Sequence, residues 1–253
     1  PGMAQPEPVA HNLTALSEYV TAQRADVGIA LDGDADRLGV VDEKGEYIST
    51  LQTFALLALY FLETRGQRGP LVKSVTMTSM IYSLGEMFDA PVYETPVGFK
   101  YLGPVMTERD ALAGGEESGG YSFRGHIPER DGILSGLYLL DMMVKTGKSP
   151  SKLLDYLFSK VGPHFYDRTD VPFAPERRAK TEKRVASQRP DALAGVRVVG
   201  RDEVDGTRFH LEGGAWALVR FSGTEPLLRI YAEAESPERV HRILEDVRAL
   251  VGV

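Results

Sequence analysis

The sequence feature that most restricts the fold is an acidic stretch at residues 32–37, Asp-Gly-Asp-Ala-Asp-Arg, set between apolar runs at 27–31 and 38–41. Three carboxylates this close together cannot be buried without compensation, whereas the flanking runs have the length and composition of buried strands. The pattern therefore predicts two strands joined by an acidic loop. Asp32, Asp34 and Asp36 would repel one another unless a hard cation gathered their oxygens, so we expect a Mg²⁺ site here.

Arg37 closes this acidic loop and suits a different partner. A guanidinium does not ligate a cation, but it can hold a phosphate oxygen, so a metal and Arg37 together indicate two contacts to one phosphoryl group. Other kinds of loop share parts of the pattern. An EF-hand also has Asp at loop positions 1, 3 and 5, and Glu43 falls at position 12, but position 6 should be Gly where this chain has Arg37.

Two further alternatives concern the same acidic loop. In an aspartyl phosphotransferase Asp32 itself would be the nucleophile, but the sequence shows no second acidic cluster downstream to complete such a site. The loop could also be a solvated acidic turn with no ligand. The interpretation as a Mg²⁺ and phosphate site gives a role to each charged residue of the loop, the three aspartates as metal ligands and Arg37 as a phosphate contact.

Composition excludes several classes of protein. The 253 residues suffice for one large domain or two modest ones, and 43% hydrophobic with 26% charged residues is typical of globular proteins. A formal net charge of −7 argues against a nucleic-acid or anionic-membrane surface, and the longest apolar stretch, at 54–62, is too short to span a bilayer. Because the chain has no cysteine, it has no disulfide, zinc thiolate site or catalytic thiol. We expect a cytoplasmic protein without nucleic-acid or membrane partners.

Apolar periodicity predicts a layered α/β arrangement up to about residue 160. A helix carrying Leu13, Leu16 and Val20 on one face precedes the acidic loop, and Thr50 is expected to cap a helix that runs to Gly66. Strand and helix patterns then alternate as far as a helix over 132–146.

The pattern changes near residues 161–163. Strands and a basic helix at 175–188 follow, with a closing helix from Pro237, and this predicts a smaller α+β unit. We therefore expect three segments: 1–50 with the acidic loop, an α/β domain over 51–160, and an α+β domain over 161–253.

Residues 220–229, Arg-Phe-Ser-Gly-Thr-Glu-Pro-Leu-Leu-Arg, join two apolar strands. Ser222, Gly223 and Thr224 offer hydroxyls and backbone N–H groups that can surround an anion, and Arg220 and Arg229 add positive charge. This composition indicates a phosphate-binding loop, although an ordinary turn beside an exposed arginine has the same letters.

Two more loops carry polar groups suited to a sugar. In Gly-Gly-Glu-Glu-Ser-Gly-Gly at 114–120, Glu116 and Ser118 fit vicinal hydroxyls, while the glycines let the backbone approach a ligand; a flexible acidic turn is the alternative. In the segment 96–102, Lys100 stands between aromatic residues. A partly buried lysine has a lowered pKa and can exchange protons or bind phosphate, unless its stem merely covers apolar surface. The roles of three nearby residues stay open: His126, Arg130 and Asp131.

These four loops, Asp-Gly-Asp-Ala-Asp-Arg, Gly-Phe-Lys, Gly-Glu-Glu-Ser-Gly and Arg-Phe-Ser-Gly-Thr-Glu-Pro, resemble in this order the α-D-phosphohexomutase family, which includes phosphoglucomutases and phosphomannomutases. The family has three α/β domains of similar fold and a C-terminal α+β domain around one active site. The resemblance implies that this chain corresponds to the end of domain 2 and all of domains 3 and 4, with the N-terminal domains as missing partners.

The resemblance also implies roles for the loop residues. Glucose 1-phosphate, glucose 6-phosphate and a bisphosphorylated hexose would be the ligands, with Mg²⁺ as cofactor. The expected roles are metal ligation by Asp32, Asp34 and Asp36, phosphoryl contact by Arg37, proton transfer or phosphate contact by Lys100, sugar binding by Glu116 and Ser118, and binding of the non-reacting phosphate by Arg220, Ser222, Gly223, Thr224 and Arg229.

One part of the family pattern is missing from the sequence. The phosphoserine of the family lies in a Thr-Ala-Ser-His-Asn-Pro type motif, and none of the 253 residues forms one, so we expect this chain alone to be inactive as a mutase, and a non-catalytic sugar-phosphate-binding fragment is the alternative. Glu117 in the sugar loop is typical of phosphoglucomutases, which favours glucose over mannose, whereas glucosamine enzymes have Gln there. Discrimination rests on single hydroxyls, so mannose stays open.

Overall fold

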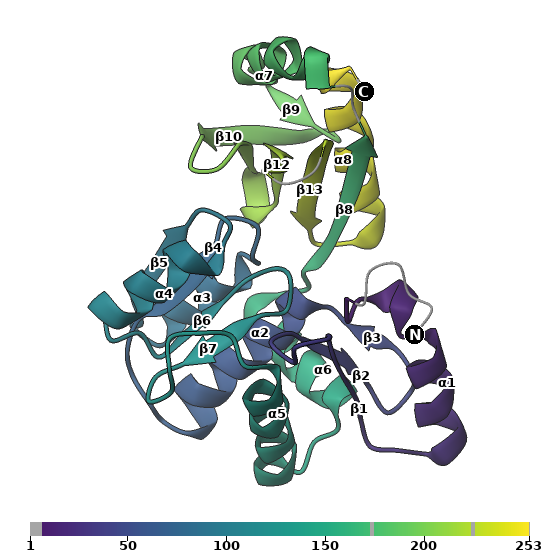
Figure 1. Ribbon diagram of the computed structural model, residues 1–253, viewed down its shortest axis with the longest axis vertical. Coiled ribbons are helices and arrows are strands. Elements are labelled where there is room, and N and C mark those ends of the chain that lie inside the picture. Colours follow the sequence, from purple (N-terminus) through teal and green to yellow (C-terminus); the bar gives the residue numbers. More distant parts are fainter. Residues whose placement is uncertain (1–6, 173–174, 224–225, 253) are drawn as a thin grey trace. The chain divides into compact units, whose positions relative to one another are not determined.

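The computed structural model describes residues 7–172, 175–223 and 226–252. The chain forms two compact units, residues 1–162 and 163–253, which we describe separately (Figure 1).

The acidic loop joins two antiparallel strands of the N-terminal unit. Strand β1 (Gly28–Leu31) pairs with β2 (Leu38–Val41), which pairs in turn with β3 (Tyr47–Ile48). A 3-10 turn (Ala10–Asn12) and helix α1 (Thr14–Gln23) precede them. The prediction of two strands around the loop is confirmed, and the helices that an EF-hand requires do not flank it.

The next helix starts one residue earlier than the sequence suggested. Helix α2 (Thr50–Leu59) is capped by Ser49, whose hydroxyl accepts the Gln52 N–H at 3.2 Å, while the Gln52 side chain accepts the Ser49 N–H at 3.1 Å. The prediction that Thr50 is the cap was therefore wrong. Thr50 is the first helical residue, and its hydroxyl instead donates to the Glu117 carbonyl at 2.6 Å. A π-helical turn (Tyr60–Thr64) continues α2.

A second sheet in the N-terminal unit has the order β5-β4-β6-β7. Strands β4, β5 and β6 are parallel, and β7 is antiparallel to β6. Helix α4 packs on β4, β5 and β6, while α3 contacts β4 and β5 and lies next to the buried helix α2. The element bounds are β4 (Leu71–Ser74), α3 (Met80–Met87), β5 (Val92–Thr95), α4 (Phe99–Glu108), β6 (Ala113–Gly115) and β7 (Tyr121–Phe123). These are the helix and sheet layers expected of an α/β domain.

Two helices complete this unit. Helix α5 (Gly132–Thr146) has the predicted bounds; Asp131 caps it by accepting the Leu134 N–H at 2.8 Å, and Gly147 ends it with φ of 64°. Helix α6 (Pro150–Val161) packs on α2 and was not predicted from the sequence.

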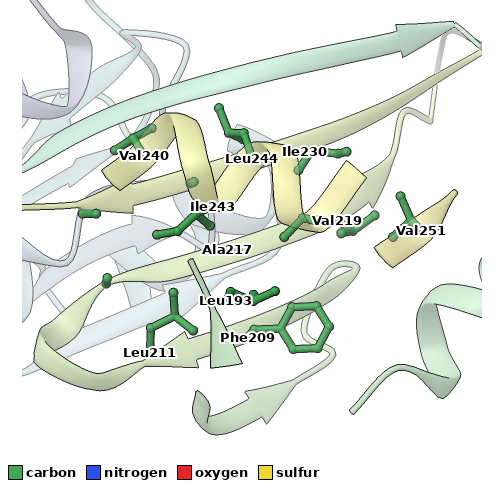
Figure 2. Packing of buried hydrophobic residues seen from close by; sticks show 14 of the residues in the cluster. Leu193, Phe209, Leu211, Ala217, Val219, Ile230, Val240, Ile243, Leu244 and Val251 are labelled. Carbon is green, nitrogen blue, oxygen red and sulfur yellow. The ribbon is translucent and has the colours of Figure 1, made fainter. Parts of the chain in front are cut away.

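The C-terminal unit is an antiparallel sheet covered by helices, with strand order β8-β13-β12-β11-β10-β9. Figure 2 shows Val240, Ile243 and Leu244 of its last helix, α8, packed against the sheet residues Ala217 and Ile230. The α+β expectation is confirmed. The bounds are β8 (Phe165–Pro172), a 3-10 turn (Pro175–Arg177), α7 (Arg178–Ser187), β9 (Ala192–Leu193), β10 (Val196–Asp202), β11 (Thr207–Leu211), a 3-10 turn (Glu212–Gly214), β12 (Trp216–Phe221), β13 (Leu227–Ala234) and α8 (Pro237–Val251).

Candidate functional site

The acidic loop is folded around one of its own carboxylates. Asp32 Oδ1 accepts the backbone N–H groups of Asp36 and Arg37, at 3.0 and 3.2 Å, and Ala35 adopts a left-handed conformation with φ of 61°. Asp32, Asp34 and Asp36 each present a carboxylate oxygen, and these oxygens lie within 4.8 Å of one another. This all-oxygen donor set suits a hard divalent cation such as Mg²⁺.

Asp36 has the most unusual surroundings of the three. Among the described residues, its buried Oδ1 atom has no hydrogen-bond partner, whereas Oδ2 lies 2.7 Å from Arg130 Nη2. Burial raises the pKa of Asp36, as does the neighbouring carboxylate of Asp32, and the positive charge of Arg130 opposes the rise. A buried carboxylate oxygen without a hydrogen bond fits a cation ligand, so the residues present match a Mg²⁺ site.

Arg37 lies beside the carboxylates of this loop. Its Nη1 atom is 2.9 Å from Glu7 Oε1, and its Nε atom is 3.3 Å from Asp32 Oδ2. The Arg37 side chain is about one quarter exposed, so a phosphoryl group could reach it.

Backbone hydrogen bonds connect the acidic loop to the sugar loop. The Leu38 N–H donates to the Gly119 carbonyl at 3.0 Å, and Arg37 forms an isolated β-bridge with Gly120. The Gly132 N–H, at the start of α5, donates to the Ala35 carbonyl at 3.0 Å. Segments about 80 to 100 residues apart in sequence are therefore held together through the main chain.

Glu116 connects the sugar loop to the start of α4. It is 5% exposed, and its Oε1 atom accepts the Gly98 N–H at 2.8 Å. Burial raises the pKa of Glu116, while the hydrogen bond from Gly98 and the charge of Arg130 partly offset this effect. The Gly-Phe-Lys and Gly-Glu-Glu-Ser segments thus meet at one carboxylate.

A cavity of about 730 Å³ lies where these segments meet. Lys100, Glu116, Ser118 and Arg130 are among the residues that line it. Its size is within the range of small-molecule sites. Of the two interpretations of Lys100, the partly buried one does not hold: Lys100 is exposed, and its Nζ atom lies 5.0 Å from the centre of the Tyr101 ring, as in the interpretation in which its stem covers a neighbouring surface. Lys100 is the second residue of α4, and in this first turn Phe99 and Leu102 are buried whereas Lys100 is exposed.

His126 and Asp131 form a separate pair. His126 Nε2 lies 3.0 Å from Asp131 Oδ2, and the other carboxylate oxygen of Asp131 caps α5. Of the three residues with open roles, Arg130 is the one that lines the cavity.

The expected phosphate loop belongs to the C-terminal unit. Arg220 on β12 and Arg229 on β13 stand directly opposite each other in the strand register. Like charges in such a pair destabilise a sheet unless anions compensate them. Asp205 Oδ2 lies 2.8 Å from Arg220 Nε, and Asp170 Oδ2 lies 3.7 Å from Arg229 Nε. Each arginine thus has an acidic partner of its own, and a guanidinium is a group that can also bind a phosphate.

The remaining residues of this loop are only partly described. Ser222 is buried and its N–H donates to the Leu227 carbonyl at 2.9 Å, Gly223 is exposed, and Thr224 lies outside the described residues. Sequence reasoning missed Arg178, at the start of α7. Its Nη1 atom donates to the Ser222 carbonyl at 3.4 Å, and with Arg220 it lines a cavity of about 340 Å³. A basic helix was the available signal, but no spacing pointed to this arginine.

The position of Glu43 argues against a calcium loop. Its carboxylate accepts hydrogen bonds from Ser149 and Ser151, at the start of α6, instead of joining the three aspartates. Asp32, the candidate nucleophile of the phosphotransferase alternative, has one oxygen engaged by two backbone N–H groups. Among the described residues, one group of three acidic side chains has metal-ligand spacing. No helix in the described part of the chain has the length and apolar character needed to cross a bilayer.

Comparison with protein-family models gives three matches along the chain. Residues 1–45 match "Phosphoglucomutase/phosphomannomutase, alpha/beta/alpha domain II", residues 51–161 match domain III, and residues 178–250 match the C-terminal domain. The three models therefore follow one another in the order expected for a single family.

Curated relatives and solved structures agree with these matches. A phosphoglucomutase/phosphomannomutase of Thermococcus kodakarensis is 35% identical over 95% of this chain and 50% of its own length. A phosphoglucosamine mutase of Bacillus mycoides is 34% identical over 94% of this chain and 50% of its own length. A crystal structure from Thermus thermophilus, provisionally named a phosphomannomutase, is 37% identical, with a TM-score of 0.83 over 98% of this chain and 51% of that chain.

The chain spans about half the length of the curated relatives it matches. The order of the four loops, the α/β and α+β units and the three consecutive model matches lead to one assignment. The chain belongs to the α-D-phosphohexomutase family of phosphoglucomutases and phosphomannomutases.

Proposed function

We propose that this chain is the metal- and sugar-binding part of a phosphohexomutase, an isomerase that interconverts hexose 1-phosphate and hexose 6-phosphate. The observation that carries the proposal is the backbone connection between the acidic loop and the sugar loop. It consists of the hydrogen bond from the Leu38 N–H to the Gly119 carbonyl and of the β-bridge between Arg37 and Gly120. Through this connection a carboxylate cluster suited to a cation adjoins a cavity lined by Glu116 and Ser118.

At the reacting end, Asp32, Asp34 and Asp36 would hold Mg²⁺, which when bound supplies charge neutralisation to a transferring phosphoryl group. Arg37 would then contact that phosphoryl group, since its guanidinium lies beside the same carboxylates. The chemistry of phosphoryl transfer depends mainly on such positioning and charge.

In the cavity, Glu116 and Ser118 would bind sugar hydroxyls. One oxygen of Glu116 is fixed by the Gly98 N–H, which sets the direction of the carboxylate before a sugar arrives. Lys100, exposed at the edge of the cavity, would contact phosphate or move a proton at the reacting oxygen.

The C-terminal unit would hold the non-reacting phosphate. The facing pair Arg220 and Arg229 supports this role, and Ser222, Gly223 and Thr224 would add hydroxyl and backbone donors. We assign residues 1–50, 51–160 and 161–253 to the end of family domain 2, domain 3 and domain 4.

Transfer between O1 and O6 in this family proceeds through a phosphoserine and a bisphosphorylated sugar that reorients between two steps. No phosphoserine motif occurs in the 253 residues, so we propose that this chain binds hexose phosphate without turning it over. Glucose phosphate is our first candidate because of Glu117. Mannose phosphate stays open, and glucosamine phosphate joins it because curated relatives include phosphoglucosamine mutases.

Calorimetric titration of the chain with glucose 1-phosphate in the presence of Mg²⁺ tests the proposal. Glu116→Gln keeps an acceptor for the Gly98 N–H but removes the charge, and we expect binding about fivefold to tenfold weaker. Glu108→Gln, at an exposed position at the end of α4, is the matched control and should bind like the native chain. Equal affinities for native and Glu116→Gln chains would refute the sugar site. Titrations with mannose 1-phosphate and glucosamine 1-phosphate rank the substrates.

A further inference from the structure

Arg130 lies between the acidic loop and the sugar cavity. Its Nη2 atom is 2.7 Å from Asp36 Oδ2, and its guanidinium carbon is 5.9 Å from the centre of the Phe99 ring. The side chain is 28% exposed and lines the cavity beside Glu116 and Ser118. Arg130 therefore contacts one of the carboxylates suited to a cation while it also faces the space suited to a ligand.

Within the described part of the chain, the ion pair of Arg130 with Asp36 is the shortest contact between a guanidinium and a carboxylate of the acidic loop. Arg37, the other arginine at this loop, is 3.3 Å from Asp32 and 3.7 Å from Asp36. A metal ion that approaches Asp36 meets the positive charge of Arg130 at short range, where like charges repel strongly. The guanidinium on Oδ2 and an ion on the unpartnered Oδ1 would therefore repel each other across one carboxylate.

Gly120 provides the space that Arg130 occupies. A Cβ atom at position 120 would lie 2.3 Å from Arg130 Cδ and 2.8 Å from Cγ, well inside van der Waals contact. Gly120 is not among the residues with positive φ, so its backbone conformation would accept other residues. The path of the arginine side chain, not the backbone, accounts for glycine here.

We propose that Arg130 is a displaceable counter-cation of the metal site. It neutralises Asp36 when no metal is bound, leaves this carboxylate when Mg²⁺ binds, and then offers its guanidinium to an anionic group in the cavity, the phosphoryl group of a sugar phosphate. The absence of a side chain at Gly120 leaves room for Arg130 to reach Asp36. The inference rests on the Mg²⁺ site of the proposed function and gives the order of events there: metal binding prepares the cavity for phosphate.

Titration with Mg²⁺ alone, followed by calorimetry, separates competition from a general charge effect. Arg130→Gln removes the competing cation, and we expect Mg²⁺ to bind about threefold to tenfold more tightly. Gly120→Ala keeps the charge but pushes the arginine away from Asp36, so it should also tighten Mg²⁺ binding. In the double variant the two effects should not add, because both act through one ion pair.

Arg109→Gln is the matched control, since it removes an exposed arginine of the same unit that pairs with Glu108 outside the cavity. It should leave Mg²⁺ affinity unchanged. Unchanged or weaker Mg²⁺ binding by Arg130→Gln overturns the proposal, as does an unaltered affinity in a folded Gly120→Ala chain. If Gly120→Ala does not fold, Arg130→Met replaces it as the second variant. We expect Arg130→Met, like Arg130→Gln, to bind Mg²⁺ more tightly than the native chain. Should neither native chain nor variants bind Mg²⁺, the metal site of the proposed function fails as well.

The second half of the proposal concerns the anion. Saturating Mg²⁺ should strengthen glucose 1-phosphate binding by the native chain, and this enhancement should fall at least about threefold in Arg130→Gln. An equal enhancement in both chains would leave Arg130 without a role toward phosphate and overturn this half alone.

Discussion

Glu43 makes a contact that links two distant parts of the N-terminal unit. It lies in the turn between β2 and β3, and its carboxylate accepts the Ser149 hydroxyl at 2.8 Å, the Ser151 hydroxyl at 2.5 Å and the Ser151 N–H at 3.2 Å. The last two donors stand at the start of α6, where the helix dipole also favours a negative charge. We predict that Glu43→Gln destabilises this unit in a pH-dependent way.

The magnitude follows from the pKa of Glu43. Burial alone would raise this pKa, but hydrogen bonds from Ser151 and Ser149 outweigh burial and lower it from 4.5 to about 2. A lowered acid pKa stabilises the folded state fully above about pH 4.5, and the stabilisation disappears as the pH falls toward 2. The difference corresponds to at most about 3 kcal/mol, which partial solvent exposure reduces to about 1 to 2 kcal/mol at pH 7.

Urea unfolding followed by far-UV circular dichroism at pH 7, 5 and 3 measures this effect. Glu46→Gln, an exposed position in the same hairpin, is the control and should be neutral at each pH. Trp216, the single tryptophan, reports the C-terminal unit separately by fluorescence. The reasoning is refuted if Glu43→Gln and Glu46→Gln lose equal stability, or if the loss in Glu43→Gln does not shrink between pH 5 and pH 3.

Three further predictions concern the ligand sites. Asp34→Asn should abolish Mg²⁺ binding by calorimetry with an unchanged circular dichroism spectrum, because Asp34 is exposed in a loop between strands; loss of folding would make the loop structural. Arg220→Ala should weaken glucose 1-phosphate binding by about 1.5 to 3 kcal/mol, the range for a charged hydrogen bond, and an unchanged affinity would remove the phosphate loop from the proposal. The purified 253-residue chain should show no mutase activity in a coupled assay, and measurable turnover would contradict the need for a phosphoserine outside it.

Local patterns predicted those elements whose signals are local. The helix over Gly132–Thr146 was predicted with its observed bounds because capping Asp131 and terminating Gly147 both stand next to it in the sequence. Thr50 was mistaken for a cap because two hydroxyl residues are adjacent there, and only the reciprocal bond between Ser49 and Gln52 distinguishes them.

Contacts between distant residues were beyond sequence reasoning. Helix α6 does have local signals, since Ser149 is its N-cap and Pro150 its first residue, and these were overlooked. The bonds from Ser149 and Ser151 to Glu43, more than 100 residues earlier, have no such local signal. For the same reason the sequence singled out Asp36 and Arg130 separately but not their ion pair. The exposure of Lys100 depends on where α4 begins, and flanking aromatic residues do not reveal it.

The hydrogen bonds between the acidic loop, the sugar loop and the start of α5 have a consequence for protein engineering. The Leu38 N–H donates to the Gly119 carbonyl, and the Gly132 N–H donates to the Ala35 carbonyl, so each bond joins two segments. Because these bonds join main-chain groups, exchanging residues 114–120 alone for those of a relative keeps the Leu38–Gly119 bond only where the backbone of the loop follows the same path. A graft designed to change the substrate should therefore carry residues 32–38, 114–120 and 130–132 together, as one transplantable unit.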